Sequence, residues 1–354
     1  LFCLSNIMKK IFSVVAAIIS LVILEFHYLS NSNSEEKISK YFSNDKGILS
    51  IMYHRFNENK YPSTNIRMEI FKEHMKIIKS LGYEFYNPKL LINEFNMPKN
   101  EKKILITIDD GFKSFYDNAW PYLKKNKIPF ILFVSTEPVG KRGYMNWNEI
   151  KEIDNSDLGY IGHHSHSHDY LIDMENSMFK DDIERASEIF KEELGYVPDI
   201  FSYPFGEFSL VMKNYISENF KLGFGQHSGV IDINKDKFEL PRFPINEKYG
   251  ELKRFKSLIN YFPLEYKSLS PEDKKINSKS NPPKILIEFF PEQRNLKNIT
   301  CYSNDGGSWK KTDLKFKGNN LVVNLKDPYL PRRGRINCSL NDKGKWRWFG
   351  TQFI

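Results

Sequence analysis

Residues 47–258 alternate between unbroken apolar runs and stretches whose apolar residues recur three and four positions apart. The runs "ILSIMY", "KILITI" and "FILFVS" predict buried strands, and the helical spacing predicts amphipathic helices that pack on them. Strands that alternate with helices predict an α/β fold with a parallel sheet, in the form of a barrel or distorted barrel. The helical positions are Phe71, Met75, Ile78 and Leu81 before Gly82, and Phe179, Ile183, Ala186, Phe190 and Leu194 before Gly195.

The C-terminal part of the chain has a different pattern. Residues 267–282 are charged and rich in Pro and Ser, which predicts a linker after an α/β domain over residues 47–266. Short apolar runs separated by turn residues follow, and they predict a small antiparallel β-sandwich over residues 283–354. Within it, Cys301 and Cys338 could form a disulfide in an oxidising compartment or remain two buried thiols.

The first residues have the pattern of a targeting segment. Met8 is followed by two lysines and an apolar run that ends at Leu24, the arrangement of a secretory signal. The run is short against the roughly 20 residues of a membrane-spanning helix, and no clear cleavage site follows it. We therefore expect residues 1–29 to be a signal peptide or a signal anchor that starts at Met8, and residues 30–46 to be a linker. The mature protein is expected outside the cytoplasm, as a secreted, periplasmic or membrane-anchored protein.

The chain is basic, with 52 Lys and Arg residues against 44 Asp and Glu residues and a formal net charge of +8. The positive charge is spread thinly along the chain, and no Arg-rich run is present in the sequence. This distribution is typical of a solvated surface and argues against a nucleic-acid partner. The alternative is attraction to anionic envelope polymers or lipid headgroups.

Two adjacent carboxylates, Asp109 and Asp110, follow the predicted strand "KILITI". At the end of a strand the chain turns, so both side chains can reach one pocket. Two carboxylates side by side are costly unless a cation or another strong partner neutralises one of them. The pair is therefore a candidate functional site at the carboxyl end of the sheet, with an ordinary turn or a helix N-cap as the alternative.

Four of the eight histidines lie within the segment "HHSHSH". His164 and His168 are four residues apart, so on one helical turn both rings would face the same side. Two imidazoles and one carboxylate form a three-ligand site with open positions, which is typical of catalytic zinc. The alternatives are a pairing of His163 with His166, and a histidine-rich loop that binds no metal.

Three short motifs occur in a fixed order: "TIDDG", then "HSHSH" with "DYL" directly after it, then "FSYPFG". With these motifs the chain resembles a polysaccharide deacetylase of carbohydrate esterase family 4, the NodB homology domain. "LSIMYHRF" and "MNW" are similar to the branch that deacetylates the biofilm polymer poly-N-acetylglucosamine. The resemblance implies a distorted (β/α) barrel with a divalent metal, usually Zn²⁺ and otherwise Co²⁺ or Ni²⁺.

The activity that the resemblance implies is hydrolysis of N-acetyl groups on a polysaccharide or oligosaccharide, such as a chitooligosaccharide or poly-N-acetylglucosamine. Trp147 and Tyr203 are candidates for a wall on which sugar rings stack, with core packing as the alternative. Two other functions stay open. One is an O-deacetylase that acts on acetylated xylan or peptidoglycan, and the other is a catalytically weak glycan-binding protein on the same scaffold.

The resemblance also implies roles for individual residues. Asp110, His164 and His168 match the metal ligands of the family. Asp109 matches the general base that takes a proton from the attacking water. The backbone N–H of Phe205 matches a donor that stabilises the oxyanion.

Two departures from the family pattern concern catalytic groups. Where many members have an arginine before the proline of the third motif, this chain has Ser202 and Tyr203. Arg242 in "LPRFPI" is the candidate replacement, with an ordinary surface arginine as the alternative. No histidine follows His227, so the usual general acid is absent, and His54 in "MYHRF" is the first candidate for that role and His227 the second.

Overall fold

The computed structural model describes residues 47–91, 102–232, 235–293 and 295–354. The expected signal segment at residues 1–29 and the expected linker at residues 30–46 lie outside the described residues. Within the described part of the chain, no helix has the length and apolar character needed to cross a membrane. The described residues of the α/β part and the C-terminal strands belong to one compact unit.

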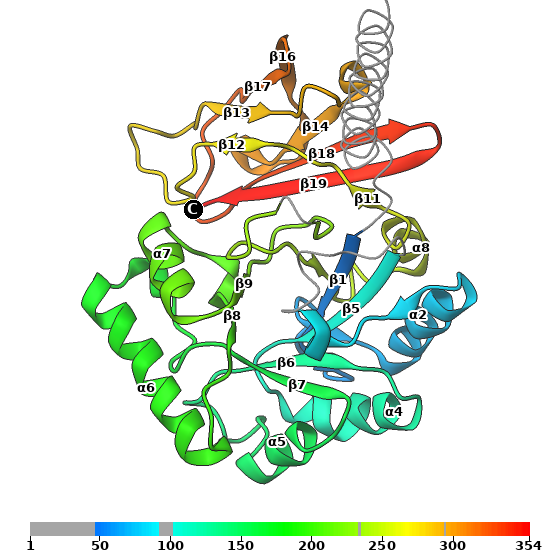
Figure 1. Cartoon of the computed structure of the whole chain (residues 1–354), viewed down its shortest axis with the longest axis vertical. Helices are drawn as coiled ribbons and strands as arrows, with labels where there is room; N and C mark the ends of the chain where they lie inside the picture. The colour runs from blue at the N-terminus through cyan, green and yellow to red at the C-terminus, as the bar shows by residue number, and fades with distance from the viewer. Residues whose placement is uncertain (1–46, 92–101, 233–234, 294) are drawn as a thin grey trace, which may run out of the picture. The chain divides into compact units, whose positions relative to one another are not determined.

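A parallel sheet forms the first part of the fold, in the strand order β10-β1-β5-β6-β7-β8-β9, with β4 beside β5. Its pairings are all parallel, as the unbroken apolar runs predict. A further parallel bridge joins Phe224 to Leu240, so the sheet curls from β9 back toward β10. The expected distorted (β/α) barrel is confirmed (Figure 1). The strands are β1 (Gly47–Tyr53), β4 (Glu84–Phe85), β5 (Lys102–Ile108), β6 (Phe130–Val134), β7 (Gly159–His163), β8 (Ile200–Ser202), β9 (Leu222–Phe224) and β10 (Phe243–Pro244).

Helices lie on the outer side of these strands (Figure 1). Phe71, Met75 and Ile78 of α2 are fully buried, as their spacing predicts. The prediction is wrong for Leu81, which is 45% exposed because α2 ends one residue before it. Gly195 adopts the left-handed conformation that ends α6, which confirms the predicted stop. The helices are α2 (Met68–Ser80), the π-helical turn η2 (Phe115–Ala119) that runs into α4 (Trp120–Lys125), α5 (Trp147–Asp154), α6 (Asn176–Leu194), α7 (Leu210–Asn219) and α8 (Leu252–Leu258).

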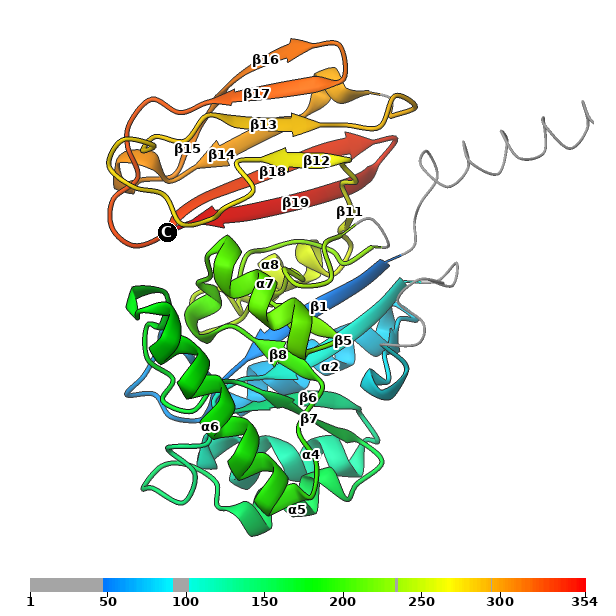
Figure 2. The ribbon, with the colours of Figure 1, turned by 60° about the vertical axis from the view of Figure 1, so that its left-hand side comes forward.

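The C-terminal strands form two facing sheets of a small sandwich (Figure 2). One sheet has the order β11-β19-β18-β14-β15 and the other the order β12-β13-β17-β16, and their pairings are antiparallel except that of β11 with β19. Both β11 and β12 lie before residue 283, and β12 falls inside the expected linker at residues 267–282. The strands are β11 (Phe262–Pro263), β12 (Ser268–Ser270), β13 (Ile285–Glu288), β14 (Thr300–Ser303), β15 (Lys310–Lys311), β16 (Asp313–Lys317), β17 (Asn320–Asn324), β18 (Gly334–Asp342) and β19 (Lys345–Phe353).

A disulfide cross-links the sandwich, and side-chain contacts join the sandwich to the barrel. Cys301 of β14 and Cys338 of β18 lie opposite each other and form a disulfide, the first of the two alternatives for these residues. Trp348 of β19 stacks on Tyr261, with ring centroids 4.9 Å apart. The Trp348 indole N–H also donates to the hydroxyl of Ser228 at 2.9 Å, so the loop after β9 is fixed to the C-terminal sheet.

A buried histidine joins α2 to the sheet and to the region around α8. His74 is fully buried, and its ring stacks on Phe255 of α8 with centroids 3.8 Å apart. Nδ1 lies 3.0 Å from the Tyr53 hydroxyl and Nε2 lies 2.7 Å from the Gly250 carbonyl oxygen, so a neutral ring that donates from Nε2 satisfies both contacts. Burial lowers the pKa of His74 to about 4.

We predict that His74 makes the fold sensitive to acid. As the pH falls from 6.5 toward about 4, the unfolded chain binds a proton at this histidine that the folded protein excludes, so stability falls. The difference in pKa corresponds to about 3 kcal/mol across this window. Urea unfolding at a pH above the window and at a pH inside it should show a smaller loss in His74→Gln than in the wild type. Lys79→Gln, exposed on the same helix, is the control, and an undiminished loss in His74→Gln would refute the prediction.

Candidate metal centre

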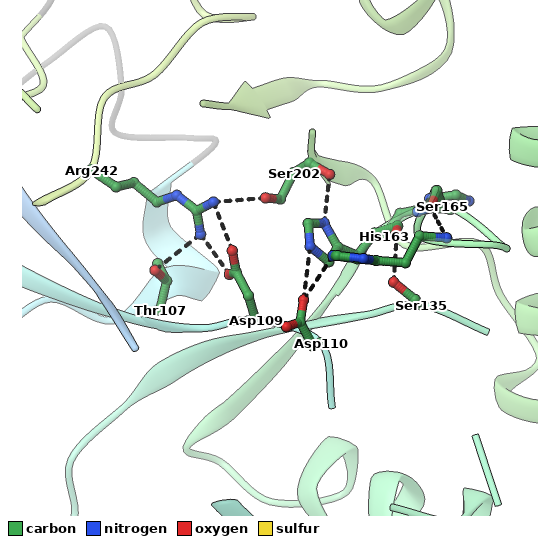
Figure 3. A network of polar contacts seen from close by, with 10 residues as sticks. Thr107, Asp109, Asp110, Ser135, His163, Ser165, Ser202 and Arg242 are labelled. Carbon is green, nitrogen blue, oxygen red and sulfur yellow. Dashed lines mark hydrogen bonds and ion pairs between the residues drawn. The ribbon is translucent and has the colours of Figure 1, made fainter. Parts of the chain in front are cut away.

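Three potential metal ligands meet at the carboxyl ends of two strands. Asp110 follows β5, and His164 and His168 follow β7, so all three lie at the same edge of the sheet. One ligand atom from each lies within 4.8 Å of the others, and no second group of this kind is found among the described residues. Oδ1 of Asp110 is 3.3 Å from Nε2 of His164 and 3.0 Å from Nε2 of His168 (Figure 3).

The donor atoms suit a divalent cation. Nδ1 of His164 donates to the Ser202 carbonyl oxygen at 2.7 Å, so its Nε2 carries the lone pair and faces Asp110. Within the described part of the chain, Nε2 of His164 and Oδ1 of Asp110 are buried without a hydrogen-bond partner. Two imidazole nitrogens and one carboxylate oxygen leave open positions on a tetrahedral ion, as catalytic zinc requires. The three side chains therefore fit a metal of this type.

Asp110 and the two histidines shift each other's pKa values. Burial alone would raise the pKa of Asp110, but His168 and His164 hold it well below its usual range. Burial alone would lower the pKa of His168, but Asp110 raises it above its usual value. The carboxylate is therefore ionised at neutral pH, as a metal ligand must be.

The backbone at the centre adopts left-handed conformations that residues other than glycine rarely occupy. Asp110, Ser165, His168 and Phe205 have φ values of 75°, 70°, 56° and 59°. Strained residues of this kind gather where a site needs a fixed geometry. The prediction that one helical turn aligns the two histidines is wrong, because residues 164–169 form an irregular loop in which two left-handed residues direct the rings.

A guanidinium from a distant part of the chain holds Asp109. Nη1 and Nη2 of Arg242 donate to Oδ1 and Oδ2 of Asp109 at 2.6 and 2.9 Å, and both side chains are fully buried. The same guanidinium donates to the hydroxyls of Thr107 and Ser202 (Figure 3). Its Nε donates to the Gly225 carbonyl oxygen at 2.9 Å, so all five of its N–H groups have partners. Burial excludes the surface alternative for Arg242, and its part in catalysis stays a prediction.

His54 lies beside this centre, directly after β1. Its Nδ1 is buried without a hydrogen-bond partner among the described residues. Burial lowers the pKa of His54, against the opposing charges of Asp110 and Asp109. A ring that is neutral at pH 7 has no imidazolium proton to give, so this shift does not favour the predicted role as general acid.

The other histidines are turned away from the centre. His163 packs between the rings of Phe190 and Phe201, and burial lowers its pKa to about 3. Nδ1 of His166 lies 2.8 Å from the Thr136 hydroxyl. The alternative pairing of His163 with His166 is therefore wrong. His227, the second candidate for the general acid, lines a separate cavity, and burial lowers its pKa to about 3.

The predicted sugar-stacking wall is wrong for Tyr203. Its ring is fully buried and stacks on Phe208 with centroids 4.6 Å apart, so it belongs to the core behind the third motif. Trp147 is half-buried and packs edge-on against Phe190 of α6 at 5.9 Å, which is the core-packing alternative. Each of the two residues follows a polar residue in its motif. A motif of this kind does not show whether the aromatic ring is buried or exposed.

The aromatic ring exposed beside the centre is Tyr170, which we did not single out from the sequence. It is 41% exposed and stacks on Phe205 with centroids 4.2 Å apart. The Phe205 ring in turn packs edge-on against His168 at 4.8 Å. The signal that could have revealed Tyr170 is its place two residues after the predicted ligand His168.

The turn that carries Phe205 leaves one amide free. The amides of Gly206 and Glu207 donate to the carbonyl oxygens of Tyr203 and Pro204. No described residue accepts a hydrogen bond from the Phe205 amide. The amide is therefore free to donate to a ligand, and its role as oxyanion donor stays a prediction. Only glycine fits at position 206, because a Cβ there would lie 2.4 Å from the backbone nitrogen of the neighbouring loop.

The C-terminal sandwich braces this turn from outside the barrel. Glu207 is 2% exposed, and its two oxygens accept hydrogen bonds from Nη1 of Arg332 and Nε of Arg333, both at 2.9 Å. The side-chain amide of Gln352 donates to the Gly206 carbonyl oxygen. The sequence shows none of these contacts, because Arg332 lies 125 residues after Glu207 and no local pattern links them.

The chain is similar to several known proteins. Residues 96–222 match a family described as polysaccharide deacetylase. The chain is 23% identical over 253 residues to the poly-β-1,6-N-acetyl-D-glucosamine N-deacetylase of Staphylococcus epidermidis, covering 62% of this chain and 86% of that protein. It is 24% identical over 200 residues to Bacillus subtilis YxkH, whose name places it with the polysaccharide deacetylases. The match covers 55% of this chain and 70% of that protein. The structure of IcaB from Ammonifex degensii matches the fold with a TM-score of 0.54 and 24% identity, covering 62% of this chain and 99% of that one.

We predict that Arg242→Gln destabilises the fold by about 3 to 5 kcal/mol, because it leaves the buried Asp109 carboxylate without its partner. Urea unfolding measures the loss. Arg142→Gln, at an exposed arginine, should change stability by less than about 0.5 kcal/mol. A loss in Arg242→Gln no larger than in this control would mean that the carboxylate does not depend on the guanidinium.

Proposed function

Because the chain carries a polysaccharide deacetylase domain, we propose that the protein is a metal-dependent enzyme that hydrolyses N-acetyl groups on an N-acetylglucosamine-containing glycan. The observation that carries this proposal is one arrangement at the edge of the sheet. A three-ligand centre lies next to Asp109, whose carboxylate Arg242 holds in place. The name of the Staphylococcus epidermidis relative favours poly-N-acetylglucosamine as the polymer.

Asp110, His164 and His168 are the residues that would hold the ion, with Zn²⁺ as the proposed metal and Co²⁺ or Ni²⁺ as alternatives. A bound divalent ion would supply an activated water near neutral pH and would polarise the acetyl carbonyl. The chain contributes ligand orientation. The Ser202 carbonyl fixes the ring of His164, and the loop of residues 164–169 fixes the position of His168.

Asp109 is the proposed general base. With both carboxylate oxygens held by Arg242, it can take a proton from the attacking water without reorienting. Because burial lowers the pKa of His54, we propose that Asp109 returns this proton to the departing amine, with His54 as the alternative donor. The products are acetate and a glycan with a free amine.

The turn around Phe205 is proposed to face the reacting acetyl group. Its free amide can donate to the oxygen on which negative charge develops, an interaction worth a few kcal/mol of transition-state stabilisation. Tyr170 lies between the ring of Phe205, at 4.2 Å, and the guanidinium of Arg332, at 3.6 Å, so both faces of its ring are covered. We propose that its exposed edge contacts the glycan, in place of the stacking wall expected from Tyr203 and Trp147.

We propose that the enzyme works outside the cytoplasm. Disulfides persist in oxidising compartments, and Cys301 and Cys338 form one in the C-terminal sandwich. The apolar segment after Met8 supports export as well. Association with a membrane through residues 1–29 is part of this proposal.

We predict that metal binding and catalysis separate by mutation. Asp110→Ala and His168→Ala should lose both bound metal and acetate release, because each removes a ligand of the same ion. Asp109→Asn should keep the metal and lose activity by at least about 100-fold, because it removes the base. Metal analysis of the purified protein and an acetate assay measure the two effects. Asp117→Asn, half-exposed on η2, is the control, and full activity in Asp109→Asn would remove Asp109 from the mechanism.

Acetate release across a panel of glycans tests the proposed function. Chitin oligomers, poly-N-acetylglucosamine, peptidoglycan and acetylated xylan form the panel, and the expected substrate is an N-acetylated one, with poly-N-acetylglucosamine first. Release from acetylated xylan alone would favour the O-deacetylase. A metal-loaded protein that releases no acetate from any of them would favour the glycan-binding alternative.

A further inference from the structure

A cavity of about 240 Å³ lies where the loop after β9, the region around α8 and the sheet of β18 and β19 meet. None of Asp109, Asp110, His164 and His168 lines it, so it is separate from the metal centre. Pockets for drug-sized ligands measure about 300 to 1,000 Å³, so this cavity suits a group of about one sugar unit. Both the barrel and the sandwich supply its walls.

Two arginines line the cavity without an acidic partner in the described part of the chain. The guanidinium of Arg335 on β18 makes no hydrogen bond or ion pair with a described residue. Arg254 of α8 donates to the carbonyl oxygen of Tyr249 and lies over its ring at 5.1 Å. Burial lowers the pKa of both arginines. A partly desolvated guanidinium without an acidic partner is a suitable site for an anionic group, which it can bind through paired hydrogen bonds.

The acidic residue whose charge acts on Arg335 already has two other arginine partners. Glu207 acts on Arg335 through its charge, but Arg332 and Arg333 occupy its two oxygens. Asp173 pairs with Arg332 and not with Arg335. The region therefore has surplus positive charge on the side of the cavity.

Aromatic rings complete the walls. Trp309 lines the cavity and is 48% exposed, so part of its indole is open to a ligand. Tyr261 and Trp348 stack on each other at 4.9 Å and present a second apolar wall. Aromatic faces bind the apolar side of a sugar ring, and guanidinium groups bind carboxylate or phosphate through paired hydrogen bonds.

We propose that this cavity is a second glycan-binding site, specific for a sugar unit that carries an anionic group, a carboxylate or a phosphate. Arg254 and Arg335 bind the anionic group, and Trp309 stacks on the ring. The site goes beyond the proposed deacetylation and does not depend on it. It would hold an acidic unit of a polymer while the metal centre acts elsewhere on the surface.

Binding of three small sugars to the full chain tests this proposal. D-glucuronate, D-glucose 6-phosphate and D-glucose share a ring and differ in charge, and none carries an acetyl group, so the result is independent of acetate release. Titration followed by tryptophan fluorescence should show at least one charged sugar binding about tenfold or more tighter than glucose. The tighter of the two charged sugars identifies carboxylate or phosphate as the preferred group.

Variants connect the binding to the cavity. Arg335→Gln should weaken binding of the charged sugar about tenfold, and Arg254→Gln should do the same if it folds. Arg142→Gln, an exposed arginine outside the cavity, should leave the affinity unchanged. Equal binding of glucose and of both charged sugars, or unchanged affinity in Arg335→Gln, would overturn the proposal.

Discussion

The ion pair between Asp109 and Arg242 occupies the interior of the barrel, and several parts of the fold converge on it. Arg242 directly precedes β10, and its guanidinium reaches β5 through Thr107, β8 through Ser202 and the chain after β9 through Gly225. Removing two charges from water is costly, and such a pair is favourable only when every donor and acceptor is satisfied. Because this condition is met, the pair can fix a carboxylate beside the metal centre and join the first strands of the barrel to the last.

The sequence was informative where one local pattern determines the structure. Unbroken apolar runs identified the central strands, since a strand covered on both faces has no polar side. The types of the ligands followed from chemistry, because a carboxylate and two imidazoles at strand ends suit one ion. The position of Arg242 beside Asp109 was expected only from the resemblance to a family, since 133 residues separate the two.

The sequence was less informative where the burial of a side chain or the conformation of a loop determines the site. Tyr203 and Tyr170 are both tyrosines in motifs, yet one is fully buried and the other is 41% exposed. The spacing of His164 and His168 suggested a helix, but left-handed residues produce the same convergence in a loop. Each such residue costs of order 1 to 3 kcal/mol, which the packed core must offset. Spacing therefore identified the partners but not the backbone that brings them together.

The ion pairs of Arg332 and Arg333 with Glu207 join residues that are synthesised at different times. Synthesis proceeds from the N-terminus, so the metal ligands and the turn around Phe205 emerge well before Arg332, Arg333 and Gln352. Until those residues arrive, the Glu207 carboxylate lacks both counter-charges and the Gly206 carbonyl lacks its side-chain donor. The turn thus acquires its final support only after Gln352 has been synthesised, 145 residues after Glu207. The metal ligands can therefore be in place in the chain before the contacts that support the neighbouring turn exist.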